Sequence, residues 1–368
     1  MIELTGQYNT AKIFTNHADP TAIAQIEHLL NQPFMAASKI RIMPDVHAGM
    51  GCTIGTTMTI SDKVVPNLVG VDIGCGMETV LLKDKHIELA QLDKAIHAFI
   101  PAGFHIRKEA HHFADEINLE ELRCAKHIDM NRAVLSIGTL GGGNHFIELG
   151  TDEDGQMYLV VHSGSRNAGK QVCEWYQNMA ADNLGRKGKG MDRVLAYLEG
   201  EPLRDYLHDM EIMQNYADIN RKAIVKELEK RVKLKITDQF TTTHNYIDIK
   251  KMILRKGAVS AKKGKRLLVP MNMRDGSLLC VGKGNEDWNF SAPHGAGRIM
   301  SRTEAKASIT LSAYQKAMKG IYSSTVNQST LDEAPFAYQA PEQIVDNIHE
   351  TAEIVKIIKP IYNFKSAE

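Results

Sequence analysis

The chain has 368 residues, of which 43% are hydrophobic and 24% are charged. This composition is typical of a soluble globular protein with a substantial core, and it excludes disordered and fibrous proteins. Lys plus Arg and Asp plus Glu balance at 44 each, so any nucleic-acid surface must be a local patch. Five irregularly spaced cysteines, together with the lack of a membrane span or a signal-peptide pattern, lead us to expect a cytoplasmic protein.

Hydrophobic periodicity and turn residues divide the chain into elements. In the first half we expect a helix over 20–31, a strand over 39–43, a loop over 44–51, helices over 86–100 and 109–127, and strands over 133–137 and 157–161. In the second half we expect a mobile basic loop over 186–190, a helix over 203–234, a loop over 241–245, two strands within 266–281, and helices over 302–319 and 341–358. No repeat or linker interrupts them, which favours one compact α+β unit over residues 1–368.

One short segment contains a histidine that ordinary structure does not explain. Pro293 prevents a helix from running through residues 291–298, and two glycines leave the backbone beside His294 without side chains. Bare amide N–H groups next to an imidazole suit the close approach of a large anion, and Arg298 could add a forked donor for phosphate. We therefore predict that His294 is a covalent nucleophile.

Five loops share a pattern in which an apolar, strand-like run is followed by glycine and then by polar residues that can bind a ligand. Functional residues are often held in this way, on loops positioned by rigid strands. The polar residues are Asp72, Cys75, Asn144, His145, Glu148, His162, His244, Asn245 and His294. We expect them to meet in one polar cleft.

Five of these residues are candidate metal ligands: Asp72, Cys75, His145, His162 and His244. A mixed carboxylate, thiolate and imidazole set suits a divalent transition ion such as Mn²⁺, Fe²⁺, Co²⁺ or Zn²⁺. Asp72 and Cys75 could both face one ion, or the thiolate could bridge two, and a pair of ions would suit phosphoryl chemistry. The other four cysteines are interpreted as small buried hydrophobic residues.

Two further features concern nucleotide and RNA binding. The glycines at 141–143 either let a phosphate or a base edge approach the backbone, or simply form a tight turn. Residues 250–266 contain eight basic and no acidic residues, and such a run is either a solvated face or a phosphate-contacting patch. We prefer three arginines close to the ligand loops as phosphate contacts: Arg132, Arg166 and Arg302.

Six segments, in matching order and at similar spacing, resemble the RtcB family of RNA-splicing ligases. They are PDVHAGMG (44–51), GVDIGCGM (70–77), GTLGGGNHFIE (138–148), VHSGSR (161–166), THN (243–245) and SAPHGAGRIMSR (291–302). The similarity runs from about residue 40 to Lys365. It implies a single RtcB-like α+β domain with packed β-sheets, surrounding helices and a polar metal-binding cleft.

The resemblance further implies an enzyme that uses GTP and two Mn²⁺ ions to join an RNA 3′-phosphate or 2′,3′-cyclic phosphate end to a 5′-hydroxyl end, in RNA repair or tRNA splicing. In this scheme the cyclic phosphate is opened, the histidine matching His294 takes GMP, the GMP passes to the RNA 3′-phosphate, and the 5′-hydroxyl displaces it. The alternative is a metal-dependent phosphoesterase that acts on such ends without joining them, which would need the metal ligands but not His294.

The resemblance also assigns roles by matching position. Asp72, Cys75 and His145 would bind one ion, and Cys75, His162 and His244 the other. The guanylate would be held by Asn144, His145, Glu148, Asn245, Ser277, His294, Gly295, Ala296, Gly297, Tyr338 and Lys365. RNA phosphates would be met by Arg132, Arg166 and Arg302.

The chain departs from the family pattern in three respects. Pro270–Ser277 (PMNMRDGS) replaces the family's usual Gly-Ser-Met-Gly-Thr nucleotide loop, and Met50 stands where a lysine is common. The chain is also shorter than the commonest members. These departures resemble a short branch that is associated with a release-factor-like partner, PrfH, and with the repair of damaged RNA.

Overall fold

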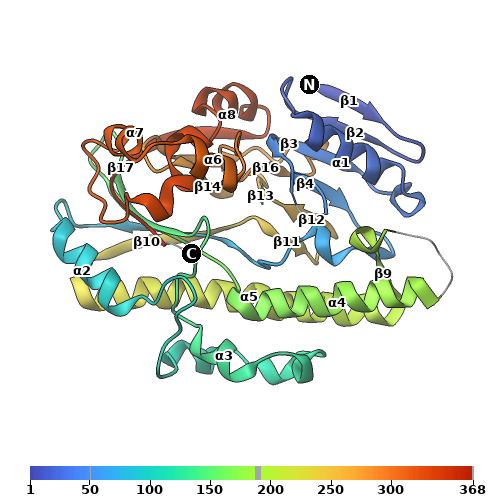
Figure 1. The fold of residues 1–368 in the computed structure, drawn as a ribbon, viewed down its shortest axis with the longest axis horizontal. Coiled ribbons are helices and arrows are strands. Elements are labelled where there is room, and N and C mark those ends of the chain that lie inside the picture. The colour runs from blue at the N-terminus through green and yellow to red at the C-terminus, as the bar shows by residue number, and fades with distance from the viewer. Residues whose placement is uncertain (50, 187–191, 367–368) are drawn as a thin grey trace.

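Two β-sheets contain most of the strands in the computed structural model, which describes residues 1–49, 51–186 and 192–366 (Figure 1). The first sheet has six strands in the order β1 (Ile2–Thr5), β2 (Thr10–Ile13), β3 (Ile40–His47), β4 (Ile54–Thr59), β12 (Ile253–Lys256) and β11 (Asn245–Asp248). The second has seven in the order β10 (Ile236–Thr243), β6 (Gly76–Leu82), β8 (Met157–Ser163), β7 (Phe146–Thr151), β17 (Ala352–Lys365), β15 (Gly276–Gly282) and β14 (Arg266–Asn272).

Two further strand pairs form small two-stranded sheets of their own. They are β13 (Ala258–Ser260) with β16 (Ser291–Pro293), and β5 (Lys63–Val64) with β9 (Leu198–Glu199). The seven-stranded sheet curls so that its two edge strands meet, and the Leu268 N–H of β14 donates to Thr242 Oγ1 of β10 at 3.1 Å. Its neighbouring strands pair antiparallel throughout, so alternate strand ends point to the same rim.

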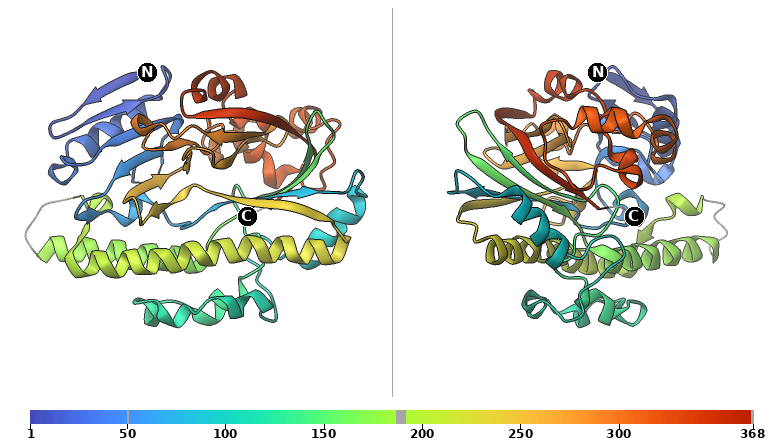
Figure 2. Two further views of the ribbon diagram at one scale, coloured as in Figure 1. Left: turned by 180° about the vertical axis from the view of Figure 1, so that it is seen from behind. Right: turned by 60° about the vertical axis from the view of Figure 1, so that its left-hand side comes forward.

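The helices cover the sheets on two sides (Figures 1 and 2). The two long helices α4 (Arg166–Arg186) and α5 (Gly200–Val232) run side by side along one side, with α3 (Met130–Leu135) outside them. The shorter helices are α1 (Pro20–Leu30), α2 (Leu89–Phe99), α6 (Arg302–Ser308), α7 (Leu311–Ala317) and α8 (Pro341–Ile348). Buried aromatic and sulfur-containing residues such as Tyr176 of α4 and Met213 of α5 join the largest hydrophobic core. The predicted α+β class with packed sheets is confirmed.

Several predicted elements are correct: the helix at 20–31, the long helix at 203–234, the strand at 157–161 and the strand pair within 266–281. The predicted strand at 133–137 is wrong. This apolar segment belongs largely to α3, because the Asp129 side chain accepts the Arg132 N–H at 2.9 Å and starts a helix there. The helix predicted over 109–127 is a series of short 3₁₀ turns instead.

Four further predictions are also corrected. The loop expected over 44–51 is strand as far as His47, and the loop expected over 241–245 is two strands that meet at His244. The helix expected over 302–319 is two helices, α6 and α7. The helix expected over 341–358 ends at Ile348 and gives way to β17. Met50 and all of the expected basic loop at 186–190 except Arg186 lie outside the described residues. Within the described part of the chain, the helices are all too short or too polar to cross a membrane.

Candidate metal and nucleotide site

The candidate metal ligands lie at one rim of four neighbouring strands. In the sheet order, β10, β6, β8 and β7 follow one another, and each is antiparallel to the next. The ends of β8 and β10 therefore meet the starts of β6 and β7. Cys75 directly precedes β6, His145 precedes β7, His162 is the penultimate residue of β8, and His244 directly follows β10. Asp72 lies in the turn before Cys75, where its carbonyl accepts the Cys75 N–H at 3.2 Å.

Cys75 lies at the centre of this ligand cluster. Its Sγ is 3.4 Å from His145 Nε2 and 3.3 Å from His162 Nε2. His145 Nε2 is 3.0 Å from Asp72 Oδ2, and His162 Nε2 is 3.4 Å from His244 Nε2. The donor atoms form two groups, Asp72–Cys75–His145 and Cys75–His162–His244, with the atoms of each within 4.8 Å of one another. Two ions that share a bridging thiolate would require this arrangement.

Backbone carbonyls hold two of the imidazoles in the tautomer that a metal ligand needs. His145 Nδ1 lies 2.9 Å from the Leu140 carbonyl, and His162 Nδ1 lies 3.2 Å from the Asn144 carbonyl. Since a carbonyl oxygen can only accept, we assign the proton to Nδ1 in both rings, which directs the Nε2 lone pairs to the cluster. Burial and nearby positive groups lower the pKa of His162 and of His244 well below the usual histidine value, so these rings stay neutral.

The donor set fits a divalent cation. Burial and the charge of Asp72 raise the pKa of the Cys75 thiol well above its usual value, and a cation at this position would favour the thiolate. Burial opposes ionisation of Asp72, but the positive charge of Arg166 helps to hold the pKa of Asp72 below its usual value. One carboxylate, one thiol and three imidazoles are the ligand types that Mn²⁺, Fe²⁺, Co²⁺ and Zn²⁺ accept.

His294 lies beside the cluster and is fixed by a buried carboxylate. Its ring centroid is 5.0 Å from that of His244. Asp45 Oδ2 accepts hydrogen bonds from His294 Nδ1 at 2.6 Å and from the His294 backbone N–H at 3.0 Å, and Asp45 is fully buried. Because the carboxylate accepts at Nδ1, the lone pair of the ring is on Nε2. A fixed imidazole of this tautomer is suited to nucleophilic attack.

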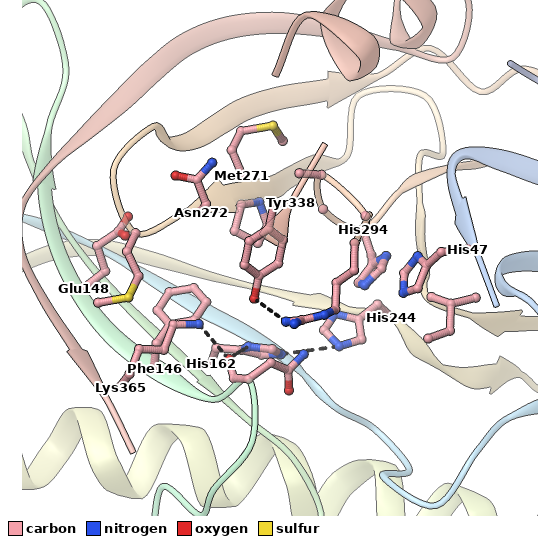
Figure 3. A pocket seen from close by; sticks show the side chains of 18 of the residues that line it. His47, Phe146, Glu148, His162, His244, Met271, Asn272, His294, Tyr338 and Lys365 are labelled. Atoms are coloured by element: carbon pink, nitrogen blue, oxygen red, sulfur yellow. Dashed lines mark hydrogen bonds between the residues drawn. The ribbon is translucent and has the colours of Figure 1, made fainter. Parts of the chain in front are cut away.

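A cavity of about 270 Å³ extends from His294 and contains the expected nucleotide-binding side chains at its far end. Figure 3 shows His47, His244 and His294 at one end, Phe146, Glu148 and Lys365 at the other, and Met271, Asn272 and Tyr338 between them. The backbone of Gly295, Ala296 and Gly297 also lines the cavity. A cavity with a reactive imidazole at one end and a few polar groups at the other suits an elongated ligand of nucleotide type.

Glu148 is an acceptor with spare capacity at the far end of the cavity. Asn363 of β17 donates its Nδ2–H to Glu148 Oε2 at 2.8 Å, and Glu148 Oε1 has no hydrogen-bond partner among the described residues. Burial raises the pKa of Glu148 to about 7, against the lowering effects of Asn363 and Lys365. A ligand that donates N–H groups would satisfy the orphaned oxygen.

Lys365 and Tyr338 are held in the cavity wall by one buried acid, Glu333. Glu333 Oε2 accepts from Lys365 Nζ at 2.7 Å and from the Tyr338 hydroxyl at 2.6 Å. Lys365 Nζ also donates to the Asn144 carbonyl at 3.2 Å. Burial opposes ionisation of Glu333, but Lys365 and Arg302 keep its pKa below the usual value. The buried lysine is therefore balanced by a fixed negative charge.

Two arginines in the same wall are occupied by protein acceptors. Arg298, expected to bind phosphate, donates to the Asp332 and Met300 carbonyls at 2.8 Å and 3.1 Å. Arg302, expected to contact RNA, donates to Asp332 Oδ2 at 2.6 Å and lies 3.1 Å from Glu333 Oε1. The structure thus places Arg302 beside the nucleotide-type cavity with its charge already compensated.

Three of the expected guanylate contacts, His145, Asn245 and Ser277, lie outside the residues that line the cavity, and His145 belongs to the ligand cluster instead. The Asn245 side chain accepts the Gly257 N–H at 2.9 Å, which fixes the turn next to His244. Ser277 is buried in β15 opposite Pro270, and its hydroxyl has no hydrogen-bond partner within the described ranges. Sequence position alone could not separate these residues from the cavity wall.

A second cavity, of about 290 Å³, borders the ligand cluster at Asp72 and His145, whereas the first borders it at His162 and His244. The cluster therefore lies between the two cavities. Arg132 and Arg166 line the second one, as do polar side chains from the start of α4. Of the three arginines predicted to contact RNA, Arg132 and Arg166 thus line the same cavity, whereas Arg302 lies elsewhere.

Gly141 makes room for the guanidinium of Arg166. It has a φ of +80°, and a Cβ at this position would come within 1.5 Å of Arg166 Nη2. Arg166 Nη1 in turn lies 3.1 Å from His145 Nδ1. The glycine-rich segment at 141–143 therefore positions an arginine next to a metal-type ligand, and Gly142 itself lines the second cavity.

The basic run at 250–266 is divided between the interior and the surface. Arg255 and Lys256 are buried, whereas Lys250, Lys251, Lys263 and Lys265 are exposed. Arg255 is fully buried and donates to Ser291 Oγ at 2.8 Å and to the Tyr246 hydroxyl at 3.0 Å. Lys262 pairs with Asp248 at 2.7 Å. The contacts of Arg255 tie β12 to the strand that leads to His294, so this part of the run is structural.

Sequence reasoning missed four residues of the site: Asp45, His47, Glu333 and Asn363. Asp45 and His47 belong to the PDVHAGMG segment, for which the sequence predicts a loop. Their alternate positions along β3 were the available signal, since side chains two apart share one face of a strand. Asn363 has the same relation to Lys365 in β17.

The matches to known proteins agree with this geometry. The profile of the RtcB family, described as tRNA-splicing ligase RtcB, matches residues 25–127 and 108–366. The chain belongs to the RtcB family. It is 29% identical to the RNA-splicing ligase RtcB of Escherichia coli (strain K12) over 401 aligned positions, which cover 97% of this chain and 98% of that protein.

Two other RtcB proteins show similar coverage. The chain is 30% identical to RNA-splicing ligase RtcB1 of Escherichia coli (strain ATCC 25922), over 97% of this chain and 98% of that protein. It is 28% identical to the tRNA-splicing ligase RtcB of Archaeoglobus fulgidus, over 92% and 90% respectively. The RtcB match therefore includes every element that contributes a ligand to the cluster.

Proposed function

We propose that this protein is a GTP- and Mn²⁺-dependent RNA ligase that joins RNA 3′-phosphate or 2′,3′-cyclic phosphate ends to 5′-hydroxyl ends. Membership of a family of RNA-splicing ligases supports the RNA-joining activity. The observation that carries the finer proposal is the placement of His294, which is held by Asp45 at 2.6 Å and lies next to the metal-type cluster. RNA repair or tRNA splicing is the process in which it would join such ends.

In the first step, His294 Nε2 attacks the α-phosphorus of GTP. A nitrogen–phosphorus bond forms, the bond to the bridging oxygen breaks, and pyrophosphate leaves. Asp45 keeps the Nδ1 proton on the far side of the ring and favours the positive charge that develops there. Bound Mn²⁺ ions would neutralise the phosphate oxygens and orient them for displacement.

In the second and third steps the guanylate is passed on. An oxygen of the RNA 3′-phosphate attacks the phosphorus on His294 and releases the ring, which leaves an activated RNA end. The 5′-hydroxyl of the other RNA then attacks the 3′-phosphorus, loses its proton and releases GMP. A 2′,3′-cyclic phosphate end must first be opened by water to the 3′-phosphate.

The cavity wall supports guanine as the base. Guanine presents two N–H donors and one carbonyl acceptor on its edge. Glu148 Oε1 is the buried acceptor that remains unpaired within the described structure, and Lys365 Nζ is the donor at the same end of the cavity. Adenine would offer an acceptor to Glu148 and would leave the carboxylate unsatisfied.

Ligation of a defined pair of RNA fragments tests the proposal directly. One fragment has a 2′,3′-cyclic phosphate end and the other a 5′-hydroxyl end, and the reaction is run with and without GTP across a panel of divalent metals. Radiolabelled GTP should label the protein in the presence of Mn²⁺, and His294→Ala should abolish both labelling and joining. Equal turnover without GTP and without a joined product would instead assign the phosphoesterase activity.

A further inference from the structure

Phe104 is the most exposed large hydrophobic residue among those described, with 80% of its surface accessible. Single exposed hydrophobic residues are common and need no explanation by themselves. Phe104 differs because it lines the second cavity, together with the metal-type ligands Asp72 and His145. An apolar ring is therefore exposed to solvent beside a polar cavity that borders the candidate metal ligands.

The loop that presents Phe104 is tightly held. The Gly103 N–H donates to the Gly141 carbonyl at 3.0 Å, and the Arg107 N–H donates to the Leu135 carbonyl at 2.9 Å, so both flanks are anchored to the segment that precedes β7. The Phe104 carbonyl itself lies 3.4 Å from Arg132 Nη2. The exposure of the ring is therefore built into the structure, because backbone hydrogen bonds fix the loop on either side of it.

The cavity beside Phe104 is positively charged. Its cationic lining residues are Arg132, Arg166 and Lys170, and Asp72 is the only acidic residue among the described residues that line it. Helix α4 begins at Arg166, so the positive end of its dipole also lies here. In a chain with equal numbers of acidic and basic residues, this is a local concentration of positive charge.

Part of this charge has no protein partner. The buried Nε of Arg166 makes no hydrogen bond within the described structure, although polar groups at such burial are usually paired. Arg166 also adopts a φ of +55°, which side chains other than glycine seldom adopt. The arginine is thus held toward the cavity with unused hydrogen-bonding capacity, as a phosphate-binding residue would be.

We propose that Phe104 stacks on a base of the phosphate-bearing RNA end, while the adjacent cations hold its phosphates. An exposed ring next to fixed cations is the arrangement by which proteins bind single-stranded nucleic acid. This inference rests on the proposed function and specifies its substrate class. The RNA end that is joined has an unpaired terminal nucleotide, because a base stacked in a duplex could not reach the ring.

The two cavities then have separate roles. The guanylate occupies the cavity that contains His294, and the RNA end approaches the ligand cluster from the side of Asp72 and His145. The phosphate of the RNA reaches the cluster without crossing the nucleotide cavity. Phe104 fixes the position of the strand relative to that phosphate and takes no part in bond making.

RNA binding measured by fluorescence anisotropy, with Mn²⁺ and without GTP, tests the inference. The probes are one 3′-phosphorylated oligoribonucleotide with a single-stranded end, the same strand with an abasic terminal nucleotide, and the same strand paired in a blunt duplex. The wild type should bind the first probe about five- to a hundred-fold more tightly than the abasic one. Phe104→Ala should lose this preference, Phe104→Leu should lose most of it, and Phe104→Trp should retain it.

Two controls separate this inference from the proposed function. Tyr8→Ala removes another exposed aromatic ring, 41% accessible and on the turn between β1 and β2, and should leave RNA affinity unchanged. Labelling by GTP should be equal in Phe104→Ala and the wild type. Stacking is overturned if the wild type binds the base-bearing, abasic and paired ends equally. It is also overturned if Phe104→Ala binds all probes as the wild type does, and either result would make the exposed ring a contact for a protein partner instead. If labelling fails while the binding preference holds, the guanylate step is wrong and the stacking stands.

Discussion

The carboxylate of Asp45 and the imidazole of His294 are 2.6 Å apart between Oδ2 and Nδ1, and the same oxygen accepts the backbone N–H of His294. One buried acid therefore fixes both the position and the tautomer of the proposed nucleophile. It comes from β3 of the six-stranded sheet, whereas the metal-type ligands gather at the rim of the seven-stranded sheet. The site thus depends on how the two sheets pack.

Asp45→Asn should slow guanylate transfer to His294 while leaving metal binding intact. The amide removes the negative charge that favours a positive ring and can present an N–H to Nδ1, which would reverse the tautomer. By analogy with aspartates that orient catalytic histidines, the rate of labelling by GTP should fall about 10²- to 10⁴-fold. Asp62→Asn, at an exposed surface position, is the matched control. Wild-type labelling by Asp45→Asn would contradict the orienting role.

Removal of single ligands should change the metal content in a graded way. Cys75 belongs to both donor groups, whereas His244 belongs to one. We therefore expect elemental analysis to find two Mn²⁺ ions per chain in the wild type, one in His244→Ala and none in Cys75→Ala. Cys280→Ala, which removes a buried thiol of β15, should retain both ions. Retention of two ions by Cys75→Ala would exclude a bridging thiolate.

The same ions should stabilise the folded protein. A cation that binds only the native state, at a free concentration 100 times its Kd, contributes about 2.7 kcal/mol to the free energy of unfolding. Dialysis against a chelator should therefore lower the Tm of the wild type, and Mn²⁺ should restore it. Cys75→Ala should show neither change, which a thermal unfolding series would reveal.

Glu148 should make stability fall as the pH rises toward neutrality. Burial raises its pKa from 4.5 to about 7, so the folded protein holds the proton after the unfolded chain has released it. The stability contribution is complete below about pH 4.5 and is lost as the pH rises to about 7, by an amount on the order of 3 kcal/mol. Glu148→Gln should remove this dependence in urea unfolding measured at pH 5 and pH 8.

Glu148→Gln should also lose the preference for GTP over ATP in the labelling reaction, because the neutral amide no longer offers two acceptor oxygens to guanine. Asp346→Asn, on helix α8, serves as the control for both measurements. Unchanged discrimination by Glu148→Gln would place the base elsewhere in the cavity.

The three arginines predicted to bind RNA should separate into two classes. Arg132→Ala and Arg166→Ala should each reduce the slope of log affinity against log salt by about 0.7, the value for one phosphate contact to a single strand. Arg302 is balanced by Asp332 and Glu333, so Arg302→Ala should leave this slope unchanged and should instead weaken labelling by GTP. A reduced slope in Arg302→Ala would return it to the RNA-binding class.

The sequence was most informative where strands end in glycine and ligand-type residues. The pattern predicted that Cys75, His145 and His244 would lie at the ends of elements. His244 follows strand β10, whereas Cys75 and His145 precede β6 and β7, and antiparallel pairing brings these strand ends to one rim. The register that places Phe146 opposite His162 depends on long-range pairing, which local pattern does not encode. Asp45 was missed for the same reason, since its partner lies in a different sheet.

The errors in secondary structure have local causes. Residues 133–137 are apolar and suggested a strand, but the cap at Asp129 and packing beside α4 favour a helix. The helix predicted over 341–358 extends into β17 because the charged residues Glu353, Lys356 and Lys359 recur every three positions, as they would on a helix. The β-branched residues between these charges, such as Ile354 and Val355, were the available signal for a strand.

The far rim of the same four strands has no ligand-type cluster among its described residues. The connections there, residues 83–88 after β6 and 152–156 between β7 and β8, turn through solvent-facing segments stabilised by their own hydrogen bonds. Changes in the length or charge of these turns would leave the donor atoms of the ligand cluster in place. The alignment with the Escherichia coli (strain K12) relative spans 401 positions for a chain of 368 residues, so chains of different length share this architecture. We would look to such remote turns for the features by which individual members acquire their own binding partners.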